Sequence, residues 1–279
     1  TEQLMKILHT ADWHLGQTFY EYDRREEHFH FLEWLKQQIK QHEIDVLLIA
    51  GDVFDSPNPS AESQRVYYRF LREVTSENPS LQIVIIAGNH DSAARLEAPN
   101  PLLEDMNIIV RGTVRRNAEG DIDLQHFIVP LYTEGKVTAY CLAVPYLRQG
   151  DYPSAENYSK GVQQLYEQLF NKVKEKGILV VAMGHLQATG SEISEDDRSE
   201  RTVIGGLECV SPDAFNEAIT YTALGHLHRS QRVSHRENVR YSGTPMPMSF
   251  AEKNNASGVV MITIDTEGTN IEKLEFQPL

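Results

Sequence analysis

The strongest constraint on the fold is the alternation of short, wholly apolar runs with longer amphipathic stretches along the first half of the chain. Residues 6–9, 45–50 (DVLLIA) and 81–87 (LQIVIIA) have the length and composition of buried strands. The stretches 24–42 and 61–74 place apolar residues at helical spacing, so each is predicted to be a helix. Strands that alternate with helices imply right-handed crossovers and therefore predict a largely parallel sheet.

The second half of the chain is richer in predicted strands. These strands cover residues 107–111, 124–131, 137–144, 178–183, 221–224, 238–242, 258–265 and 270–276. A further helix is predicted at residues 162–176. Two sheets between helical layers accommodate this number of strands, so we expect an α/β fold with two mixed β-sheets sandwiched between helices, an α/β/β/α arrangement. Because no linker is evident, the sequence predicts a single domain over residues 1–279.

Composition limits the class of protein. The 279 residues are 41% hydrophobic, which suits a folded chain with a sizeable core. No apolar run approaches the length of about 18 residues that a membrane span needs, and no secretory signal is evident. Cys141 and Cys209 lie outside any metal-spaced pattern, so we expect a cytoplasmic protein with two ordinary thiols. The net charge of −14 argues against a chain that coats nucleic acid, although bound divalent metals would still permit a phosphodiester substrate.

Five short polar motifs directly follow predicted strands. They are DWH (12–14), GDVFD (51–55), GNHD (88–91), GH (184–185) and GHLH (225–228). Their carboxylate, imidazole and amide side chains are donors that suit manganese, iron or zinc. Strand ends of an α/β sheet are where ligands bind. The motifs therefore predict a metal centre in which a shared carboxylate holds two ions around a phosphate.

Each motif also has an ordinary structural interpretation. A single Asp-x-His is usually turn polarity, and GDxxD is often a helix-capping turn. GNHD and GHLH are more specific, because a buried strand rarely ends in three ligand-type residues and alternate residues of an extended chain point the same way. Recurrence at five strand ends favours the metal centre. Outside the motifs, we expect His9 to be a packed strand residue, and His28 and His30 not to face one another.

The order of the five motifs resembles the calcineurin-like metallophosphoesterase superfamily over residues 12–228. Longer segments are similar to those of the bacterial SbcD nuclease family, namely MKILHTADWHLG (5–16), AGDVFD (50–55), AGNHDS (87–92), ALGHLHR (223–229) and YSGTPMPMSF (241–250). The resemblance implies the α/β/β/α metallophosphoesterase fold. It also implies an exonuclease or endonuclease that hydrolyses phosphodiester bonds in DNA repair.

The resemblance implies a role for each motif residue. Seven residues would bind the two ions: Asp12, His14 and His228 one ion, Asn89, His185 and His226 the other, and Asp52 both. His90 would stabilise the transition state or protonate the leaving oxygen. Asp91 would orient the His90 ring, with a simple turn cap as the structural alternative. Asp55 matches the bacterial members, and no catalytic step is assigned to it.

Similarity to the SbcD family further implies manganese as the metal, DNA as the substrate, a homodimer, and a coiled-coil ATPase of the SbcC type as partner. Members of that family continue into capping and ATPase-docking segments, which we expect to be absent from a chain that ends at Leu279. Two other functions stay open. The motifs alone do not separate a nuclease from a protein phosphatase or a cyclic-nucleotide phosphodiesterase. A non-catalytic scaffold is disfavoured, because all seven ligand positions are filled.

Two segments bear on these partners. The predicted helix 61–74 carries a broad apolar band, made of Val66, Tyr67, Tyr68, Phe70, Leu71 and Val74. Core packing with one exposed tyrosine and a dimer surface explain this band about equally well. The loop 190–206 is rich in charge of both signs, so we expect a solvated loop rather than a DNA contact through Arg198 or Arg201.

Overall fold

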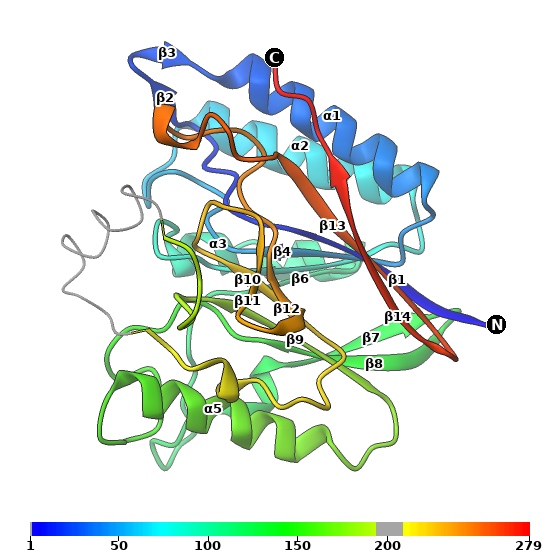
Figure 1. The fold of residues 1–279 in the computed structure, drawn as a ribbon, viewed down its shortest axis with the longest axis vertical. Coiled ribbons are helices and arrows are strands. Elements are labelled where there is room, and N and C mark those ends of the chain that lie inside the picture. The colour runs from blue at the N-terminus through cyan, green and yellow to red at the C-terminus, as the bar shows by residue number, and fades with distance from the viewer. Residues whose placement is uncertain (1, 194–208) are drawn as a thin grey trace.

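The computed structural model describes residues 2–193 and 209–279, and in it two six-stranded sheets pack face to face. Helices α1 (Arg25–Gln41) and α2 (Ala61–Glu77) cover the outer face of one sheet. Helix α5 (Tyr158–Val173) covers the outer face of the other sheet, so that the helices lie on opposite sides of the molecule (Figure 1). The predicted fold class, two mixed sheets between helical layers, is therefore confirmed.

The first sheet contains the predicted parallel strands. Its order is β14-β13-β1-β4-β5-β6, and the strands span Gly268–Glu275, Gly258–Asp265, Gln3–Thr10, Val46–Ala50, Gln82–Ile86 and Ile108–Arg111 respectively. Strands β1, β4, β5 and β6 are parallel, whereas β13 and β14 form an antiparallel pair along one edge. Every residue of β4 and β5 is buried, because helices cover one face of this sheet and the second sheet covers the other.

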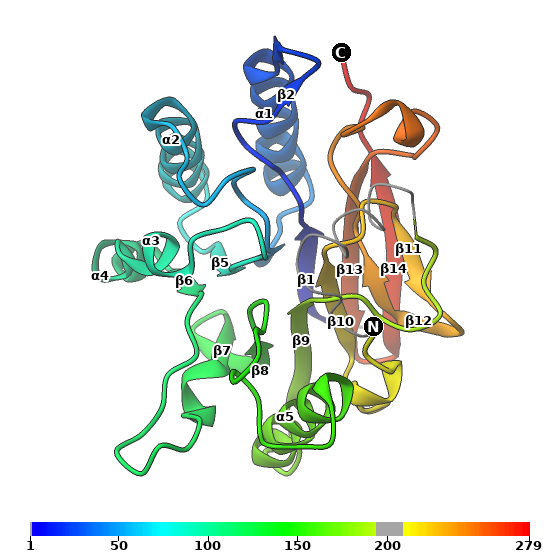
Figure 2. The ribbon, with the colours of Figure 1, turned by 90° about the vertical axis from the view of Figure 1, so that its left-hand side faces the viewer.

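The second sheet is built in a similar way, from four central parallel strands and two antiparallel edge strands. Its order is β11-β12-β10-β9-β8-β7, and the strands span Gln231–Val233, Arg236–Tyr241, Tyr221–Gly225, Leu179–His185, Lys136–Ala143 and Ile128–Thr133 respectively. Strands β8, β9, β10 and β12 are parallel. Figure 2 shows β9 and β10 of this sheet beside β1 and β13 of the first, an arrangement that brings the strand ends of both sheets near one another.

One predicted strand is wrong over half its length. Residues 124–131 were expected to be extended, but Leu124–Phe127 form a 3-10 helix and the strand β7 begins only at Ile128. Leu124 and Phe127 both pack into the apolar cluster that includes α5, and their spacing of three residues suits a helical turn. Helix α5 also begins earlier than predicted, because the side chain of Asn157 accepts a hydrogen bond from the Lys160 amide and caps it.

Several short elements were not predicted. They are the strands β2 (Thr18–Phe19) and β3 (Tyr22–Asp23), the helices α3 (Ala93–Glu97) and α4 (Asn100–Leu103), and the edge strand β11. The periodicity of apolar residues is too brief in such elements to distinguish them from turns. Strands β2 and β3 form a hairpin of their own, apart from the two large sheets.

The apolar band of α2 belongs mainly to the core. Tyr67, Phe70, Leu71 and Val74 are buried against α1 and the first sheet, and Tyr68 packs partly against the same cluster. Core packing therefore accounts for this band, as the first of the two interpretations held. No helix in residues 2–193 and 209–279 is both long and apolar enough to span a membrane. Residues 194–206 of the predicted solvated loop, with Arg198 and Arg201, lie outside the described residues.

Candidate metal centre

The loops that follow β1 and β4 run side by side and bring three predicted ligands together. The amide of Asp12 donates to the carbonyl of Gly51 at 2.9 Å, and the amide of His14 donates to the carbonyl of Asp52 at 3.0 Å. These backbone hydrogen bonds continue the parallel pairing of the two strands past their ends. As a result, Nε2 of His14 lies 3.6 Å from Oδ2 of Asp52.

The loop after β5 closes over the same carboxylate. The amide of His90 donates to Oδ1 of Asp52 at 2.9 Å, so one carboxylate oxygen is already held by the GNHD segment. A Cβ atom at Gly88 would lie 2.1 Å from that same oxygen, closer than any real contact. Only glycine at position 88 therefore lets the loop approach Asp52.

The second sheet contributes three histidines to this place. His185, the last residue of β9, has Nε2 at 3.3 Å from Oδ2 of Asp52 and 2.9 Å from Oδ1 of Asn89. The amide of His226, which follows β10 directly, donates to Oδ2 of Asp12 at 3.1 Å. The ring of His228 lies 5.4 Å from the ring of His14, measured between centroids. The strand ends of the two sheets therefore meet through these side chains.

All seven predicted ligands thus gather at one edge of the paired sheets. Two groups have donor atoms that all lie within 4.8 Å of one another, and these are His14, Asp52 and His90, and Asp12, Asp52 and His185. Asp52 belongs to both groups. Asn89 links the second group to His226, since its Oδ1 lies 3.3 Å from Nδ1 of that histidine.

The carboxylate of Asp91 binds the backbone of the loops that carry the predicted ligands. Its carboxylate accepts hydrogen bonds from the amides of Gly88, Phe54 and Val53, at 2.9, 3.0 and 3.2 Å. The ring of His90, in turn, places Nδ1 at 3.1 Å from the carbonyl of Asp55. Asp91 therefore fixes the backbone of residues 53–54, next to the peptide that His90 contacts.

Backbone strain is concentrated at this edge. Four of the gathered residues have positive φ although none is glycine, and the values are 56° for Asp12, 49° for His14, 51° for Asp52 and 109° for His226. A non-glycine residue with positive φ costs free energy and persists only where the surrounding structure imposes it. The strain therefore marks the positions at which the chain bends to aim these side chains inward.

The donor set fits divalent metal ions. Carboxylate oxygens, imidazole nitrogens and an amide oxygen converge here, and Asp12, Asp52, His14 and His185 are almost fully buried. Within the described residues, the buried Nε2 atom of His14 has no hydrogen-bond partner. A buried imidazole nitrogen rarely stays unsatisfied unless another group binds it. A divalent metal ion would bind this nitrogen, so the residues at the centre fit such an ion.

The negative charge of Asp52 favours a cation in the centre. Burial alone would raise the pKa of Asp52, but the charge and hydrogen bond of His185, together with the charges of His14 and His90, hold that pKa below its usual range. Burial lowers the pKa of His185, yet the nearby Asp52 raises it to about 9. Asp52 is therefore an anion near neutral pH, and metal binding must displace the proton of His185.

Two carboxylates contact the rings of predicted ligands. Nδ1 of His14 lies 3.0 Å from Oδ1 of Asp55, and Nδ1 of His228 lies 3.4 Å from a carboxylate oxygen of Glu252. Such contacts fix the tautomer and the orientation of a metal-binding imidazole. Sequence reasoning gave Asp55 no definite role and missed Glu252 entirely. No motif surrounds Glu252, so only its burial in the structure identifies it.

Two other histidines are packed outside the centre, as expected for His9. Nδ1 of His9 lies 2.7 Å from the Tyr221 hydroxyl and Nε2 lies 3.0 Å from the Leu224 carbonyl, so this residue of β1 joins the two sheets. Burial lowers its pKa to about 3. His28 is buried in α1, and its Nε2 lies 2.9 Å from the carbonyl of Trp13. These contacts give both histidines structural roles.

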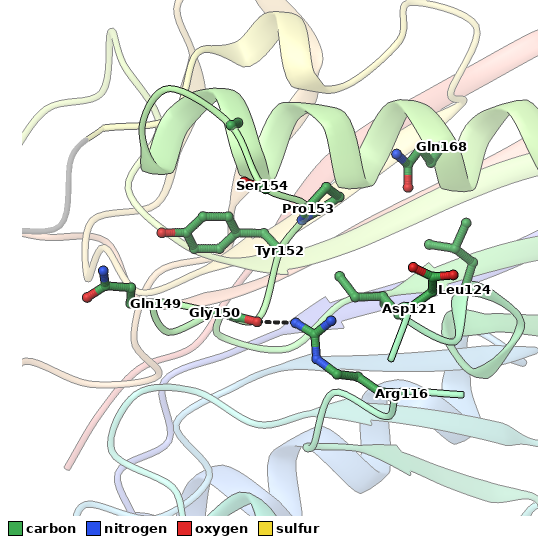
Figure 3. A pocket seen from close by; sticks show the side chains of 11 residues that line it. Arg116, Asp121, Leu124, Gln149, Gly150, Tyr152, Pro153, Ser154 and Gln168 are labelled. Carbon is green, nitrogen blue, oxygen red and sulfur yellow. Dashed lines mark hydrogen bonds between the residues drawn. The ribbon is translucent and has the colours of Figure 1, made fainter. Parts of the chain in front are cut away.

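A separate pocket of about 760 Å³ lies between the loop 116–124 and the segment 149–155, beside α5 (Figure 3). Arg116 lines this pocket and donates to the carbonyls of Gly120 and Gly150. None of the nine predicted site residues lines this pocket. The metal-binding chemistry of the described chain therefore belongs to the strand-end cluster.

Comparison with known proteins agrees with this geometry. The chain is 41% identical over 272 residues to the SbcD subunit of the nuclease SbcCD from Rhodobacter capsulatus, covering 93% of this chain and 66% of that protein. It is 32% identical over 273 residues to the protein of the same name from Escherichia coli K12, covering 93% and 65% respectively. The chain thus spans slightly less than two thirds of the length of these relatives.

A solved structure and a family model complete the comparison. A dimetal phosphatase from Danio rerio matches with a TM-score of 0.50 at 12% identity, covering 100% of both chains, and so shares the fold. The model of the calcineurin-like phosphoesterases matches residues 5–230, which include all nine predicted site residues. This family implies divalent metals, in accord with the donor set at the strand ends. The chain therefore belongs to the calcineurin-like phosphoesterase family, as the motifs predicted.

Proposed function

We propose that this chain is a metal-dependent DNA nuclease that hydrolyses phosphodiester bonds in DNA repair. The observation that carries the proposal is the shared carboxylate of Asp52, which belongs to both groups of side chains able to hold an ion. Two ions around one carboxylate suit the in-line displacement of a phosphoester. Two relatives named as parts of a nuclease, 41% and 32% identical to the chain, support DNA over a phosphoprotein or a cyclic nucleotide as substrate.

The proposed ligand assignment follows the motifs, and it differs from the two geometric groups in omitting His90 and in placing Asp12 with His14 rather than with His185. Seven residues would hold two ions: Asp12, His14 and His228 one ion, Asn89, His185 and His226 the other, and Asp52 both. The neighbouring rings of His14 and His228 support the first set. The short distances from Oδ1 of Asn89 to Nε2 of His185 and Nδ1 of His226 support the second. When bound, the ions would polarise the phosphate and provide a nucleophile at neutral pH.

His90 is the proposed acid of the reaction. A carbonyl oxygen only accepts hydrogen bonds, so Nδ1 of His90 must carry a proton in order to bond to the Asp55 carbonyl. The exchangeable proton is then the one on Nε2. That atom would donate to the leaving sugar oxygen, or stabilise the negative charge that develops on it.

Asp91 would position His90 indirectly. Its carboxylate fixes the amides of Val53 and Phe54, and the next residue, Asp55, offers the carbonyl that His90 contacts. Burial, followed by the charge of Asp52, raises the pKa of Asp91 to about 6, which the backbone amides partly oppose. This arrangement supports a positioning role for Asp91. Its hydrogen bonds to backbone amides are those of a turn cap, and through them it would position His90.

The finer features of the function are proposed with the activity. We propose manganese as the metal, since the mixed oxygen and nitrogen donors suit it. Both relatives are named as one subunit of the nuclease SbcCD, a name that itself implies a second subunit. We therefore propose DNA as substrate, a homodimer, and an SbcC-type coiled-coil ATPase as partner, all in the cytoplasm.

Cleavage of single-stranded and hairpin DNA, with manganese, magnesium and chelator in parallel, tests the proposal. Asp52→Asn removes the charge shared by both groups, so its cleavage should fall below detection while its fold is kept. Asp105→Asn, at an exposed aspartate of the first half of the chain, is the matched control and should cut as the wild type does. Absence of cutting by the wild type, with manganese demonstrably bound, would contradict the nuclease and point to another phosphoester.

A further inference from the structure

An exposed aromatic cluster lies on two segments that also carry contacts to the metal centre. We call it the aromatic rim and define it as Phe19, Tyr20 and Phe250. Its three rings contact one another, with centroids 5.0 Å apart for Phe19 and Tyr20 and 5.1 Å apart for each of these with Phe250. Tyr20 is nevertheless 68% exposed and Phe250 is 63% exposed. Clusters of aromatic side chains that remain exposed to solvent often mark a binding site for a ligand or a macromolecule.

The backbone holds the rim in place. Tyr20 and Glu21 form the two-residue turn between β2 and β3, with φ of 48° and 72°. Hairpin turns of this type normally have glycine or asparagine at these two positions. A tyrosine with positive φ therefore costs conformational free energy. Arg24 lies under the Phe19 ring, 5.3 Å from its centroid, and donates to Gln17 and to the carbonyl of Pro247. The two halves of the rim are therefore tied together by a buried cation.

The rim is connected to the metal centre on both sides. On one side, the amide of Gln17 donates to the carbonyl of His14, a proposed ligand, and Phe19 follows two residues later. On the other side, Glu252 contacts the ring of His228, and Phe250 precedes it by two residues. Figure 1 shows β2 next to the orange segment that carries Phe250. The rim is thus linked on both sides, through residues two positions away, to proposed ligands of the centre.

The chemistry of the rim indicates its ligand. The chain carries a net charge of −14, so attraction to phosphates gives it little general affinity for a nucleic acid. Exposed aromatic faces bind unpaired bases of any sequence by stacking, which does not depend on net charge. A base-paired duplex offers no free base face along its length. Resting on the proposed nuclease function, we infer that the aromatic rim stacks on an unpaired base next to the scissile phosphate.

An abasic scan tests this inference. A set of single-stranded oligonucleotides, each lacking one base at a different distance from the cut, is cleaved by the wild type, Tyr20→Asn and Phe250→Ala. On the intact strand each variant should raise KM by about 5- to 150-fold, the range expected for loss of one stacked base. Asparagine tolerates positive φ, so Tyr20→Asn removes the ring without adding strain. Tyr132→Ala, at an exposed tyrosine of the second sheet, is the control and should not change KM.

The decisive result is the absence of additivity. At one abasic position, the KM of the wild type should rise as much as the KM of each variant rises on the intact strand. On that abasic strand the KM of each variant should be no higher than it is on the intact strand. If the KM of each variant exceeded that of the wild type by the same factor on every abasic strand, the inference would be overturned. The rim would then have a structural or protein-binding role. Wild-type affinity of both variants for the intact strand would also overturn it.

A binding measurement separates this inference from the proposed function. Oligonucleotides containing the fluorescent base 2-aminopurine are titrated with each protein in the presence of chelator, so that no bond is cut. Quenching at one position, lost in Tyr20→Asn and Phe250→Ala and kept in Tyr132→Ala, supports the rim even if the wild type fails to cleave DNA. Cleavage by the wild type with unchanged quenching in both variants contradicts the rim alone and leaves the nuclease intact.

Discussion

The two sheets contribute different chemistry to the metal centre. Loops after β1, β4 and β5 of the first sheet bring every proposed oxygen donor, namely Asp12, Asp52 and Asn89. The second sheet brings imidazoles alone, and these are His185, His226 and His228. Neither sheet holds a complete set of proposed ligands. The centre therefore forms only where the two sheets pack together.

The two sheets also hold their donors differently. Asp12, His14 and Asp52 lie on loops with positive φ, whereas His185 is still part of strand β9. Nδ1 of His185 lies 2.8 Å from the carbonyl of Ala50 in β4, so sheet packing orients this ring. The first sheet thus positions these side chains by loop conformation. In the second sheet His185 is positioned by its strand, whereas His226, with φ of 109°, follows β10 on a loop. Substitutions in the two sheets should fail in different ways.

The largest contrast is expected between His90→Gln and His185→Gln. Loss of the proposed acid should lower the cleavage rate by about 10²- to 10⁴-fold and leave manganese binding unchanged. Loss of His185, which lies between Asp52 and Asn89, should instead weaken manganese binding itself. Steady-state cleavage and calorimetric titration with manganese distinguish the two. Weakened metal binding in His90→Gln would make His90 a ligand and contradict its proposed role.

Gly225→Ala tests how closely the sheets must approach. A Cβ atom at Gly225 of β10 would lie 1.9 Å from the Ala50 carbonyl of β4, so the sheets would have to move apart. Overpacking of this kind destabilises a protein by about 1–3 kcal/mol, and urea unfolding measures it. Gly135→Ala, where φ is +78° and no atom lies within 4 Å, measures the separate cost of backbone strain without steric overlap. Wild-type stability of Gly225→Ala would show that the sheet separation is not sterically fixed at Gly225.

Glu252→Gln and Asp55→Asn compare the carboxylates behind the two sets of ligands. Glu252 is 1% exposed and holds His228 of the second sheet, whereas Asp55 is 38% exposed and holds His14 of the first. Removing a carboxylate partner of a ligand costs about 10- to 100-fold in metal affinity. We expect that loss for Glu252→Gln and a smaller one for Asp55→Asn, because water can replace an exposed partner. Manganese titration of both variants would refute this order if Asp55→Asn lost more.

His9→Gln gives an effect on stability alone, largest near neutral pH and smaller in acid. His9 joins the two sheets in its neutral form, and its pKa is about 3 when folded against 6.5 for the unfolded group. Between these values the unfolded state binds the extra proton, so stability is present above pH 6.5 and is lost as pH falls. The lost stability is about 1.4 kcal/mol per pH unit. Urea unfolding of wild type and variant near neutral and near acid pH should show a difference that shrinks in acid, and a constant difference would contradict this.

The sequence predicted the centre better than it predicted the supporting structure. Asp12, Asp52, Asn89 and His185 each follow or end an apolar strand, and parallel strands deliver their ends to one edge, so convergence followed from order alone. Glu252 gave no such signal, since it stands alone in a surface-like segment and its contact with His228 depends on tertiary packing. A local sequence motif indicates which residues can bind a metal ion. The residues that support them through long-range contacts can be identified only from the tertiary structure.

The same distinction explains the wrong strand. Residues 124–131 read as extended because their apolar residues are frequent, yet Leu124 and Phe127 pack toward α5 as a helical turn does. The paired loops after β1 and β4 were equally invisible, because their backbone hydrogen bonds join residues about forty positions apart. Propensity within a short window carries no information about such partners.

The positive φ of Asp12, His14, Asp52 and His226 has a consequence for evolution in the laboratory. Glycine or asparagine would relax the backbone at each of these positions, so selection for heat resistance should favour those replacements. Every such replacement also removes the charge or the imidazole of a proposed ligand. Thermostability and turnover are therefore opposed at the same four codons, and a library screened for survival on heating alone would drift toward well-folded, inactive proteins.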